Sequence, residues 1–339
     1  MKKLMVEDSV GMMVAHDMTR VVPGTFKGVG FKKGHVVKPE DIPELLKMGK
    51  KYLYVLDRSS GATHEDEAAV RIARAICGEH LTWSDPKEGK TQIRSEIDGL
   101  LKIHVEGLKE INMLSDISVA TFKSGMPCKR GQTIAAARLI PLFTSQEKME
   151  EIERVAMRFA PIIDLLPYKR KLIGLIVTGS EVYEGLIEDG SDAFVVKKFE
   201  EYGCELVRKI IVSDDAEQIS HAIKALRDVG CDLILTTGGL SVDPDDVTLK
   251  GVRSAGAEIV SYGTPVQPGS MFLNARIGDG PILGLPACVF CSQRTVYDIL
   301  LPRVLAGEEI TQEDIAGMGH GGLCMGCDVC HFPNCSFGR

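Results

Sequence analysis

The stretch that decides the fold is LTTGGLSVDPDDVT, at residues 235–248. It begins at the end of an apolar run and then carries two glycines, four hydroxyl side chains and three carboxylates. Glycine lets a backbone approach a phosphate closely, while hydroxyls and the free N–H groups of a helix N-terminus donate to phosphate oxygens. The stretch therefore predicts a phosphate-binding turn between a strand and a helix.

The sequence around this turn alternates between apolar runs of strand length and amphipathic segments. We expect strands at 172–177, 205–212 and 232–236 with short ones near Ile259 and Ile282, and helices at 192–202, 216–229, 245–255 and 289–301. Pro302 should end or kink the last helix. Buried strands separated by helices are typical of a doubly wound, mostly parallel sheet with helices on both faces. The predicted class of residues 169–310 is therefore α/β.

The chain on either side of this domain has a different pattern. Residues 1–168 mix short apolar runs with charged turns, and predict a separate α+β region with helices at 39–48, 65–77 and 144–157 and a strand at 52–56. Residues 311–339 form a short tail rich in glycine and cysteine. We expect this tail to bind metal.

A second loop of similar chemistry, TGSE at residues 178–181, follows the first strand of the domain. Ligands of such sheets bind beyond the carboxyl ends of the strands, where both loops should lie. By itself, Thr-Gly-Ser is equally compatible with an ordinary turn between a strand and a helix.

Carboxylates beside a phosphate site suggest a divalent cation, since Mg²⁺ binds one or two carboxylates together with phosphate oxygens. Asp243, Asp245 and Asp246 are the candidates in the long loop. The alternative is that one of them caps the following helix. The same two interpretations apply to Asp214 and Asp215, which precede the helix at 216.

These loops resemble the signature motifs of molybdopterin adenylyltransferases and molybdopterin molybdotransferases. In order along the chain, the similar segments are 178–181, 212–215, 236–248, 267–269 and 284–286, with a further similarity at 10–17. The resemblance implies a site that binds the pterin dithiolene phosphate, with Mg²⁺ and possible use of ATP. The implied binding residues are Thr178, Gly179, Ser180, Glu181, Thr237, Gly238, Gly239, Ser241, Pro268, Gly269, Ser270 and Pro286. The implied catalytic carboxylates are Asp246, Asp214 and Asp215.

Three positions depart from the family pattern. Ser270 stands where the molybdotransferase loop has lysine, the tripeptide at 287–289 replaces Gly-Asn-Pro, and Ser180 replaces Asp. A missing cation weakens the stabilisation of a transferring group more than it weakens binding. Two functions follow: a molybdotransferase-like or adenylyltransferase-like enzyme of molybdenum cofactor biosynthesis, or a non-catalytic carrier or sensor of the cofactor.

Cys288 lies beside the altered tripeptide. One hypothesis is that a helix N-terminus lowers the pKa of its thiol and that the thiolate contacts the pterin or its metal. The alternative is that Cys288 and Cys291 are small apolar residues packed in a helix.

The tail carries the spacing Cys324-x2-Cys327-x2-Cys330-x4-Cys335. Four thiolates so close together suit either tetrahedral Zn²⁺ or an iron–sulfur cluster. A tail without metal, or a redox-active thiol pair, is the remaining alternative.

Composition and charge narrow the range of partners. The chain has 339 residues, 44% hydrophobic and 26% charged, which is ordinary for a globular protein. Its net charge of −7 argues against nucleic acid as a partner. The N-terminal residues do not resemble a secretory signal, so we expect a cytoplasmic protein with no membrane contact. Expected partners are molybdopterin, molybdate, a molybdoenzyme and further copies of the chain as a homo-oligomer.

Overall fold

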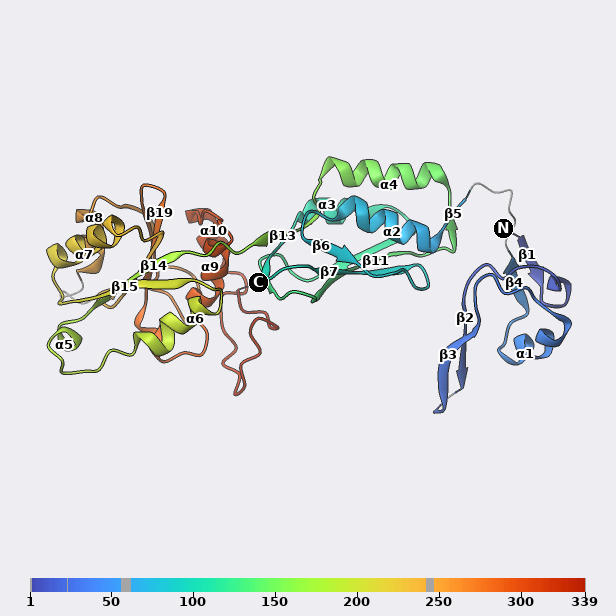
Figure 1. Cartoon of the computed structure of the whole chain (residues 1–339), viewed down its shortest axis with the longest axis horizontal. Coiled ribbons are helices and arrows are strands. Elements are labelled where there is room, and N and C mark those ends of the chain that lie inside the picture. The colour runs from blue at the N-terminus through green and yellow to red at the C-terminus, as the bar shows by residue number, and fades with distance from the viewer. Residues whose placement is uncertain (1, 23, 56–61, 242–246, 339) are drawn as a thin grey trace. The chain divides into compact units, whose positions relative to one another are not determined.

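The computed structural model describes residues 2–22, 24–55, 62–241 and 247–338, and the chain divides into two compact units (Figure 1). Unit 1 comprises Met1–Ile97, Lys102–Phe122 and Lys129–Leu165. Unit 2 comprises Asp98–Leu101, Lys123–Cys128 and Leu166–Arg339. None of the helices within the described ranges has the length and apolar character needed to cross a bilayer.

Unit 2 is built on a six-stranded sheet in the order β15-β14-β16-β19-β18-β17. Its strands are β14 Leu172–Thr178, β15 Glu205–Val212, β16 Leu233–Thr237, β17 Glu258–Tyr262, β18 Leu273–Ile277 and β19 Gly280–Leu285. The first four strands in this order are parallel to one another, whereas β18 and β17 run antiparallel to their neighbours. The predicted α/β class is confirmed, and the sheet is mixed. The sequence did not predict β18, which joins β19 in a hairpin.

Helices of unit 2 pack on both faces of this sheet. They are α5 Ser180–Tyr183, the π-helical turn η3 Asp192–Val196, α6 Lys197–Glu200, α7 Ala216–Asp228, α8 Thr248–Ser254, the 3-10 turn η4 Ala287–Phe290, α9 Val296–Leu305 and α10 Gln312–Gly317. Side chains alternate between faces along a strand. Leu175 and Val177 join one core with Phe199 of α6 and Leu300 of α9, whereas Ile176 joins a second core with α7 and α8. In Figure 1, α7 and α8 lie together on one side of β14 and β15.

The last large helix differs from the prediction of 289–301. It begins at Val296, where Thr295 and Asp298 form a capping box, and it continues through Pro302 to Leu305. A proline inside a helix costs about 3 kcal/mol because it removes a hydrogen bond and crowds the preceding turn. Leu301 and Leu305 are fully buried on either side of Pro302, and their packing offsets this cost.

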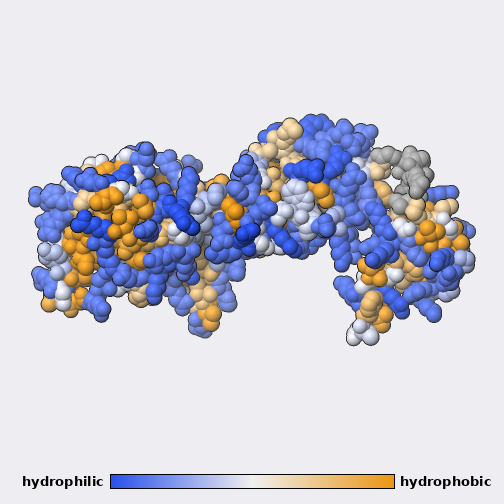
Figure 2. Space-filling view, viewed as in Figure 1, coloured by the Kyte–Doolittle hydropathy of each residue, from blue (hydrophilic) through white to orange (hydrophobic). Residues whose placement is uncertain are grey.

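The edge strand β15 exposes part of its apolar surface. Val207 and Ile211 on this strand, and Leu172 at the start of β14, are exposed. Figure 2 shows apolar surface in the region of these two strands. A strand at the edge of a sheet also carries unpaired main-chain groups, which can pair with another strand.

Unit 1 contains the predicted helices together with small antiparallel sheets. Its helical elements are η1 Glu7–Ser9, η2 Pro39–Asp41, α1 Ile42–Lys47, α2 Glu65–Ile76, α3 Val105–Met113 and α4 Gln146–Arg158. Its strands are β1 Lys2–Met5, β2 Met18–Val22, β3 Phe26–Phe31, β4 Tyr52–Val55, β5 Thr63–His64, β6 Leu81–Trp83, β7 Lys90–Ser95, β9 Ile117–Thr121, β11 Thr133–Leu139 and β12 Phe143–Thr144. Three further strands are β8 Gly99–Ile103, β10 Pro127–Cys128 and β13 Ile163–Pro167. The residues of β8 and β13 are divided between the two units, and β10 belongs to unit 2. The helices expected at 39–48, 65–77 and 144–157 are confirmed.

The helix α2 organises the core of unit 1. Its amphipathic pattern places Ala69, Ile72 and Ile76 on a buried face, which packs against β7, β11 and α4. These strands belong to a sheet of order β6-β7-β11-β9, which the sequence did not predict. Glu65 begins the helix and is buried, although it is a carboxylate.

The buried Glu65 makes the stability of unit 1 depend on pH. Burial, together with the neighbouring Asp66 carboxylate, raises the pKa of the Glu65 carboxyl to about 7. Because the pKa in the folded state lies above the ordinary value of 4.5, this group favours folding when protonated. Its contribution is complete at low pH and is lost as the pH rises through about 7.

We therefore expect Glu65→Gln to unfold at a higher temperature than the native chain at about pH 8, and at a similar temperature at about pH 5. The fluorescence of Trp83, which is the only tryptophan and lies in unit 1, follows this transition. The exposed Glu67, in the same helical turn, provides the control Glu67→Gln. An equal rise in the unfolding temperature of Glu65→Gln at both pH values would contradict the raised pKa of Glu65.

Candidate functional site

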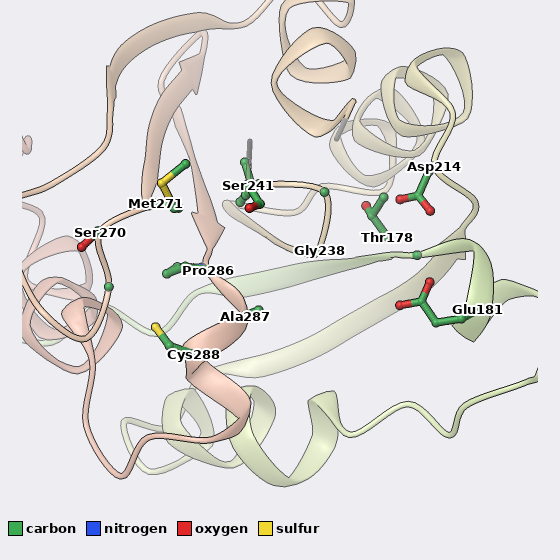
Figure 3. Close-up of a pocket in the computed structure, with 14 residues that line it drawn as sticks. Thr178, Glu181, Asp214, Gly238, Ser241, Ser270, Met271, Pro286, Ala287 and Cys288 are labelled. Carbon is green, nitrogen blue, oxygen red and sulfur yellow. The ribbon is translucent and has the colours of Figure 1, made fainter. Parts of the chain in front are cut away.

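A cavity of about 640 Å³ opens in unit 2 beyond the carboxyl ends of β14, β16 and β19 (Figure 3). It is lined by Thr178, Gly179, Glu181, Asp214, Gly238, Gly239, Leu240, Ser241, Gly269, Ser270, Met271, Pro286, Ala287 and Cys288. The three strands are neighbours and run in the same direction, so the loops that follow them meet at one edge of the sheet. This is the position at which the sequence predicted the ligand.

The loop after β14 is tied to the loop after β15. The main-chain N–H of Ser180 donates to a carboxylate oxygen of Asp214 at 2.8 Å, and the N–H of Asp214 donates to the Ser180 hydroxyl at 3.3 Å. Asp214 therefore both lines the cavity and fixes the start of α5. Thr178 precedes this loop and is buried, and its hydroxyl has no hydrogen-bond partner within the described part of the chain.

The two glycines after β16 form a turn with left-handed backbone conformations, with φ of +84° at Gly238 and +58° at Gly239. A Cβ atom at Gly238 would overlap the main-chain carbonyl oxygen of Thr178. The Thr248 hydroxyl donates to the Gly238 carbonyl at 3.0 Å and holds the turn from the helix side. Only glycine satisfies both the backbone conformation and this close approach.

The loop at 267–271 forms another wall. Gly269 has a φ of +137°, and a Cβ atom there would lie 2.6 Å from Cγ1 of Val296. The Val296 N–H donates to the Pro268 carbonyl at 3.1 Å, so the start of α9 supports this loop. Gly269, Ser270 and Met271 face the cavity, whereas Pro268 faces a second cavity on the other side of the loop.

Cys288 lines the cavity, but the predicted cause of its reactivity is wrong. It belongs to the 3-10 turn η4 and not to the start of the last helix. Burial raises the pKa of its thiol, and the neighbouring Cys291 raises it further. At neutral pH Cys288 is therefore a neutral thiol, while Cys291 is exposed.

The charged side chains that line the cavity are the carboxylates Glu181 and Asp214. Among the described lining residues there is no lysine or arginine. Ser270 lies where the similar families have lysine. Arg276, nearby in sequence, pairs with Glu258 at 2.9 Å and Glu309 at 2.8 Å and does not line the cavity.

The predicted residues divide into four groups. Those that line the cavity are Thr178, Gly179, Glu181, Asp214, Gly238, Gly239, Ser241, Gly269, Ser270 and Pro286. Those that lie behind the lining are Ser180, Thr237 and Pro268. Asp215 caps α7, with its carboxylate accepting from the N–H groups of Glu217 and Gln218, and it does not line the cavity. Asp246, like Asp243 and Asp245, lies outside the described residues.

Several lining residues were not predicted as binding residues. Leu240 lies within the predicted loop at 235–248, whereas Met271 and Ala287 directly follow predicted binding residues, and this proximity was the only sequence signal for them. They contribute apolar walls and no hydrogen-bonding side chain.

The four tail cysteines line the second cavity, of about 300 Å³. Cys324 and Cys335 are half-buried, and Cys327 and Cys330 are exposed. Across the described ranges, no three His, Cys, Asp or Glu side chains lie close enough to share one metal ion.

Comparison with known proteins defines the class of unit 2. Residues 174–306 match the family model of a probable molybdopterin binding domain, and residues 3–57 match a domain of unknown function (DUF8806). The match to the probable molybdopterin binding domain lies within unit 2 and covers less than half of the chain.

Individual relatives match only parts of the chain. A CinA-like protein of Mycobacterium avium is 38% identical over 88 residues, which is 26% of this chain and 20% of that protein. The corresponding protein of Mycobacterium tuberculosis is 34% identical over 88 residues, with the same coverage. The chain therefore spans about a fifth of the length of these curated relatives.

Two solved structures are also similar. The molybdopterin biosynthesis enzyme MoaB from Thermus thermophilus has 18% identity and a TM-score of 0.33, covering 41% of this chain and 98% of its own. The protein CinA from Thermoplasma acidophilum has 20% identity and a TM-score of 0.32, covering 34% and 88%.

The close approach at Gly238 can be tested by substitution. We expect Gly238→Ala to lower the free energy of unfolding of unit 2 by about 1–3 kcal/mol more than Gly230→Ala does. Gly230 has a similar φ of +85°, but no atom lies within 4 Å of the position that a Cβ atom would take there. Gly230→Ala therefore has only the cost of placing alanine in a left-handed conformation. Urea unfolding followed by circular dichroism measures the difference. Equal losses would mean that the overlap with Thr178 is relieved at no cost.

Proposed function

We propose that unit 2 binds molybdopterin through its phosphate in the 640 Å³ cavity, in molybdenum cofactor biosynthesis. The observation that carries this proposal is the buried Thr178 hydroxyl, which lacks a partner in the described structure and lies beside the Gly238–Gly239 turn. A buried hydroxyl without a hydrogen bond is costly, and an anionic oxygen in the cavity would accept from it. The left-handed glycines leave room for such a group against the backbone.

We propose further that Mg²⁺ accompanies the phosphate. Glu181 and Asp214 supply carboxylate oxygens on the cavity wall. Asp246 belongs by sequence to the loop that begins with the Gly238–Gly239 turn. Figure 3 shows Thr178 and Asp214 close together, with Glu181 nearby at the end of β14. Carboxylates suit Mg²⁺, which also neutralises phosphate charge where no lysine or arginine lines the site. ATP could bind in the same way through its phosphates.

The activity that we propose is that of a molybdotransferase-like enzyme, which inserts or prepares molybdenum on molybdopterin with molybdate as the second substrate. An adenylyltransferase-like reaction is the nearest variant. Within this scheme the turn at Gly238 and the Thr178 hydroxyl hold the phosphate, and Ser180 positions Asp214. Asp246 takes the catalytic carboxylate role that the family resemblance implies.

A second candidate is a non-catalytic carrier or sensor of the cofactor. The absence of lysine and arginine from the described cavity lining favours it, because the negative charge of a transferring group would lack a protein cation. A carrier would transfer its ligand to a molybdoenzyme, and the exposed edge strand β15 offers a surface for such a partner or for a second copy of the chain. In either case we propose that the four tail cysteines bind iron–sulfur or zinc.

Binding is tested by removing the hydroxyl that carries the proposal. We expect Thr178→Val to weaken molybdopterin binding by about tenfold or more, because a hydrogen bond to a charged group is lost. Thr236→Val is a matched control, since Thr236 is also buried with an unpartnered hydroxyl but does not line the cavity. Affinities are measured anaerobically by fluorescence of the pterin. Equal affinities of both variants and the native protein would contradict the proposed phosphate position.

Turnover is tested with the whole chain, molybdopterin, ATP, Mg²⁺ and molybdate. The enzyme function predicts that molybdenum enters the pterin, or that AMP or pyrophosphate forms. Asp246→Asn should then lose turnover while it retains the pterin. If the native chain retains the pterin but forms neither product, the carrier function replaces the enzyme; if the pterin is not retained, both functions fail.

A further inference from the structure

A segment with two cysteines begins at the wall of the cavity proposed to bind molybdopterin (the pterin cavity), and the proposed function uses neither thiol. This segment, CVFC at 288–291, follows β19 and precedes α9. A Cys-x-x-Cys segment between a strand and a helix is typical of thiols that exchange with disulfides. Whether these two thiols can do so depends on the geometry of the turn that carries them.

The turn η4 places the two thiols on one face. The N–H of Cys291 donates to the Cys288 carbonyl at 3.2 Å, which extends the 3-10 pattern of Ala287–Phe290 by one residue. In a 3-10 helix, side chains three residues apart eclipse one another, and a rise of about 2 Å per residue separates their Cα atoms by about 6 Å. A disulfide joins Cα atoms that are about 4.4–6.8 Å apart. The backbone of this turn therefore suits a bridge between Cys288 and Cys291.

The residues between the two cysteines fix the direction of this face. The Val289 side chain is 1% exposed in the core of unit 2. The Phe290 ring packs edge-on against Phe194 of η3, with ring centroids 6.1 Å apart. With three residues per turn, Cys288 and Cys291 share the remaining direction. The Cys291 thiol lies 3.6 Å from the Cys288 carbonyl oxygen, so it points back toward Cys288.

The two thiols differ in their access to solvent. Cys291 is exposed and lines neither the pterin cavity nor the cavity beside the tail, whereas Cys288 is half-buried and lines the pterin cavity. Burial, together with the neighbouring Cys291, raises the pKa of the Cys288 thiol. Because the thiolate is the attacking species and access to it limits the reaction, a disulfide from solution meets Cys291 first. Cys288 then acts on the product.

The loop at 267–271, which forms another wall of the pterin cavity, is held by contacts outside η4. The N–H of Gln267 donates to the Gly322 carbonyl at 2.8 Å, and the N–H of Cys324 donates to the Gln267 carbonyl at 2.8 Å. A new bond within η4 therefore leaves this wall in place, and its effect on the cavity falls on Cys288. Figure 3 shows Cys288 at the cavity, next to Ala287 and Pro286.

We propose that Cys288 and Cys291 form a reversible disulfide by exchange with a low-molecular-weight disulfide, and that the reduced pair is the form that binds ligand in the pterin cavity. The second part rests on the binding function proposed for unit 2, whereas the first part does not. A disulfide turns the sulfur of Cys288 toward Cys291 and removes its S–H group, a weak donor, from the cavity wall. An anionic oxygen of the ligand loses that donor.

The exchange balances in two steps. The Cys291 thiolate attacks one sulfur of the small disulfide, whose S–S bond breaks and releases one thiolate, which leaves a mixed disulfide on Cys291. The Cys288 thiol then loses its proton to solvent and attacks the Cys291 sulfur, which expels the second thiolate. The two protein thiols lose two electrons and the small disulfide gains them. The two released thiolates take up the two protons.

The experiment exposes the full chain, reduced beforehand, to oxidised glutathione and then alkylates the remaining thiols. Tryptic cleavage after Arg276 and Arg294 releases residues 277–294, which contain Cys288 and Cys291 and no other cysteine. We expect this peptide to resist alkylation and to weigh two hydrogens less than the reduced peptide. Treatment with dithiothreitol should restore both alkylation sites. A peptide that stays fully alkylated, or that carries glutathione without forming the bridge, overturns the pair.

Two variants separate the roles of the thiols. Cys288→Ser lacks the thiol that completes the bridge, and should keep glutathione on Cys291. Cys291→Ser lacks the exposed thiol, and should take up glutathione at Cys288 about tenfold more slowly than Cys288→Ser takes it up at Cys291. Cys204→Ser, which removes a buried thiol elsewhere in unit 2, is the control and should form the bridge as the native chain does. Equal rates in the two single variants would contradict the order of attack.

The link to the cavity is measured anaerobically by pterin fluorescence with the reduced and the bridged chain. We expect the bridged chain to bind molybdopterin about threefold or more weakly, because a hydrogen bond is lost. Cys291→Ser cannot form the bridge and keeps the cavity lining, so it should bind equally before and after oxidation, which also controls for the other thiols. Equal affinities of the reduced and bridged native chain overturn the link. If the reduced native chain binds no pterin, the function proposed for unit 2 fails together with the link, while the peptide masses still decide the disulfide.

Discussion

The architecture of the site depends on one main-chain contact, the approach of the turn after β16 to the end of β14. A side chain at Gly238 would occupy the position of the Thr178 carbonyl oxygen, so the two loops can lie this close only with glycine there. Parallel pairing of β14 and β16 brings the loops together, and Thr248 holds the turn from its other side. With the loops so close, the Thr178 side chain is buried beside the turn, at the wall of the cavity. The remaining walls, contributed by β19 and the loop at 267–271, enclose the space that this contact defines.

Sequence patterns predicted those strands and helices whose burial appears as a local pattern of apolar residues. Apolar runs bounded by glycine marked β14, β15 and β16, and the amphipathic period marked α2, α4 and α7, because one face of each element is buried. β18 was missed although its five residues alternate between apolar and polar side chains, because a run this short becomes a strand through its pairing with β17 and β19. The last helix was expected to end or kink at Pro302. It continues to Leu305, because local propensity does not include the packing of the neighbouring Leu301 and Leu305.

The candidate site was predictable to the extent that its residues belong to loops at strand ends. The sequence could not predict which of the two adjacent carboxylates, Asp214 or Asp215, faces the cavity. The two differ only in the direction that the turn before α7 gives them. The acidity of Cys288 was misjudged for a related reason. The helix N-terminus expected beside it lies several residues further on, and burial acts on the thiol instead. The position of Arg276 depends on Glu258 and Glu309, whose proximity no sequence spacing reveals.

The pairing of Gln267 with the tail has a consequence for how this chain can diverge. Both hydrogen bonds use main-chain atoms, from Gln267 to Gly322 and from Cys324 to Gln267. Point substitutions along either segment therefore leave the link in place, provided that the backbone keeps its course. A change of length is different: one residue inserted or deleted between Gly322 and Cys324 would break one of the two hydrogen bonds to Gln267. Related chains should accordingly keep glycine at position 322, where a Cβ atom would overlap the main-chain oxygens of Pro265 and Met318, and keep its spacing to the first cysteine.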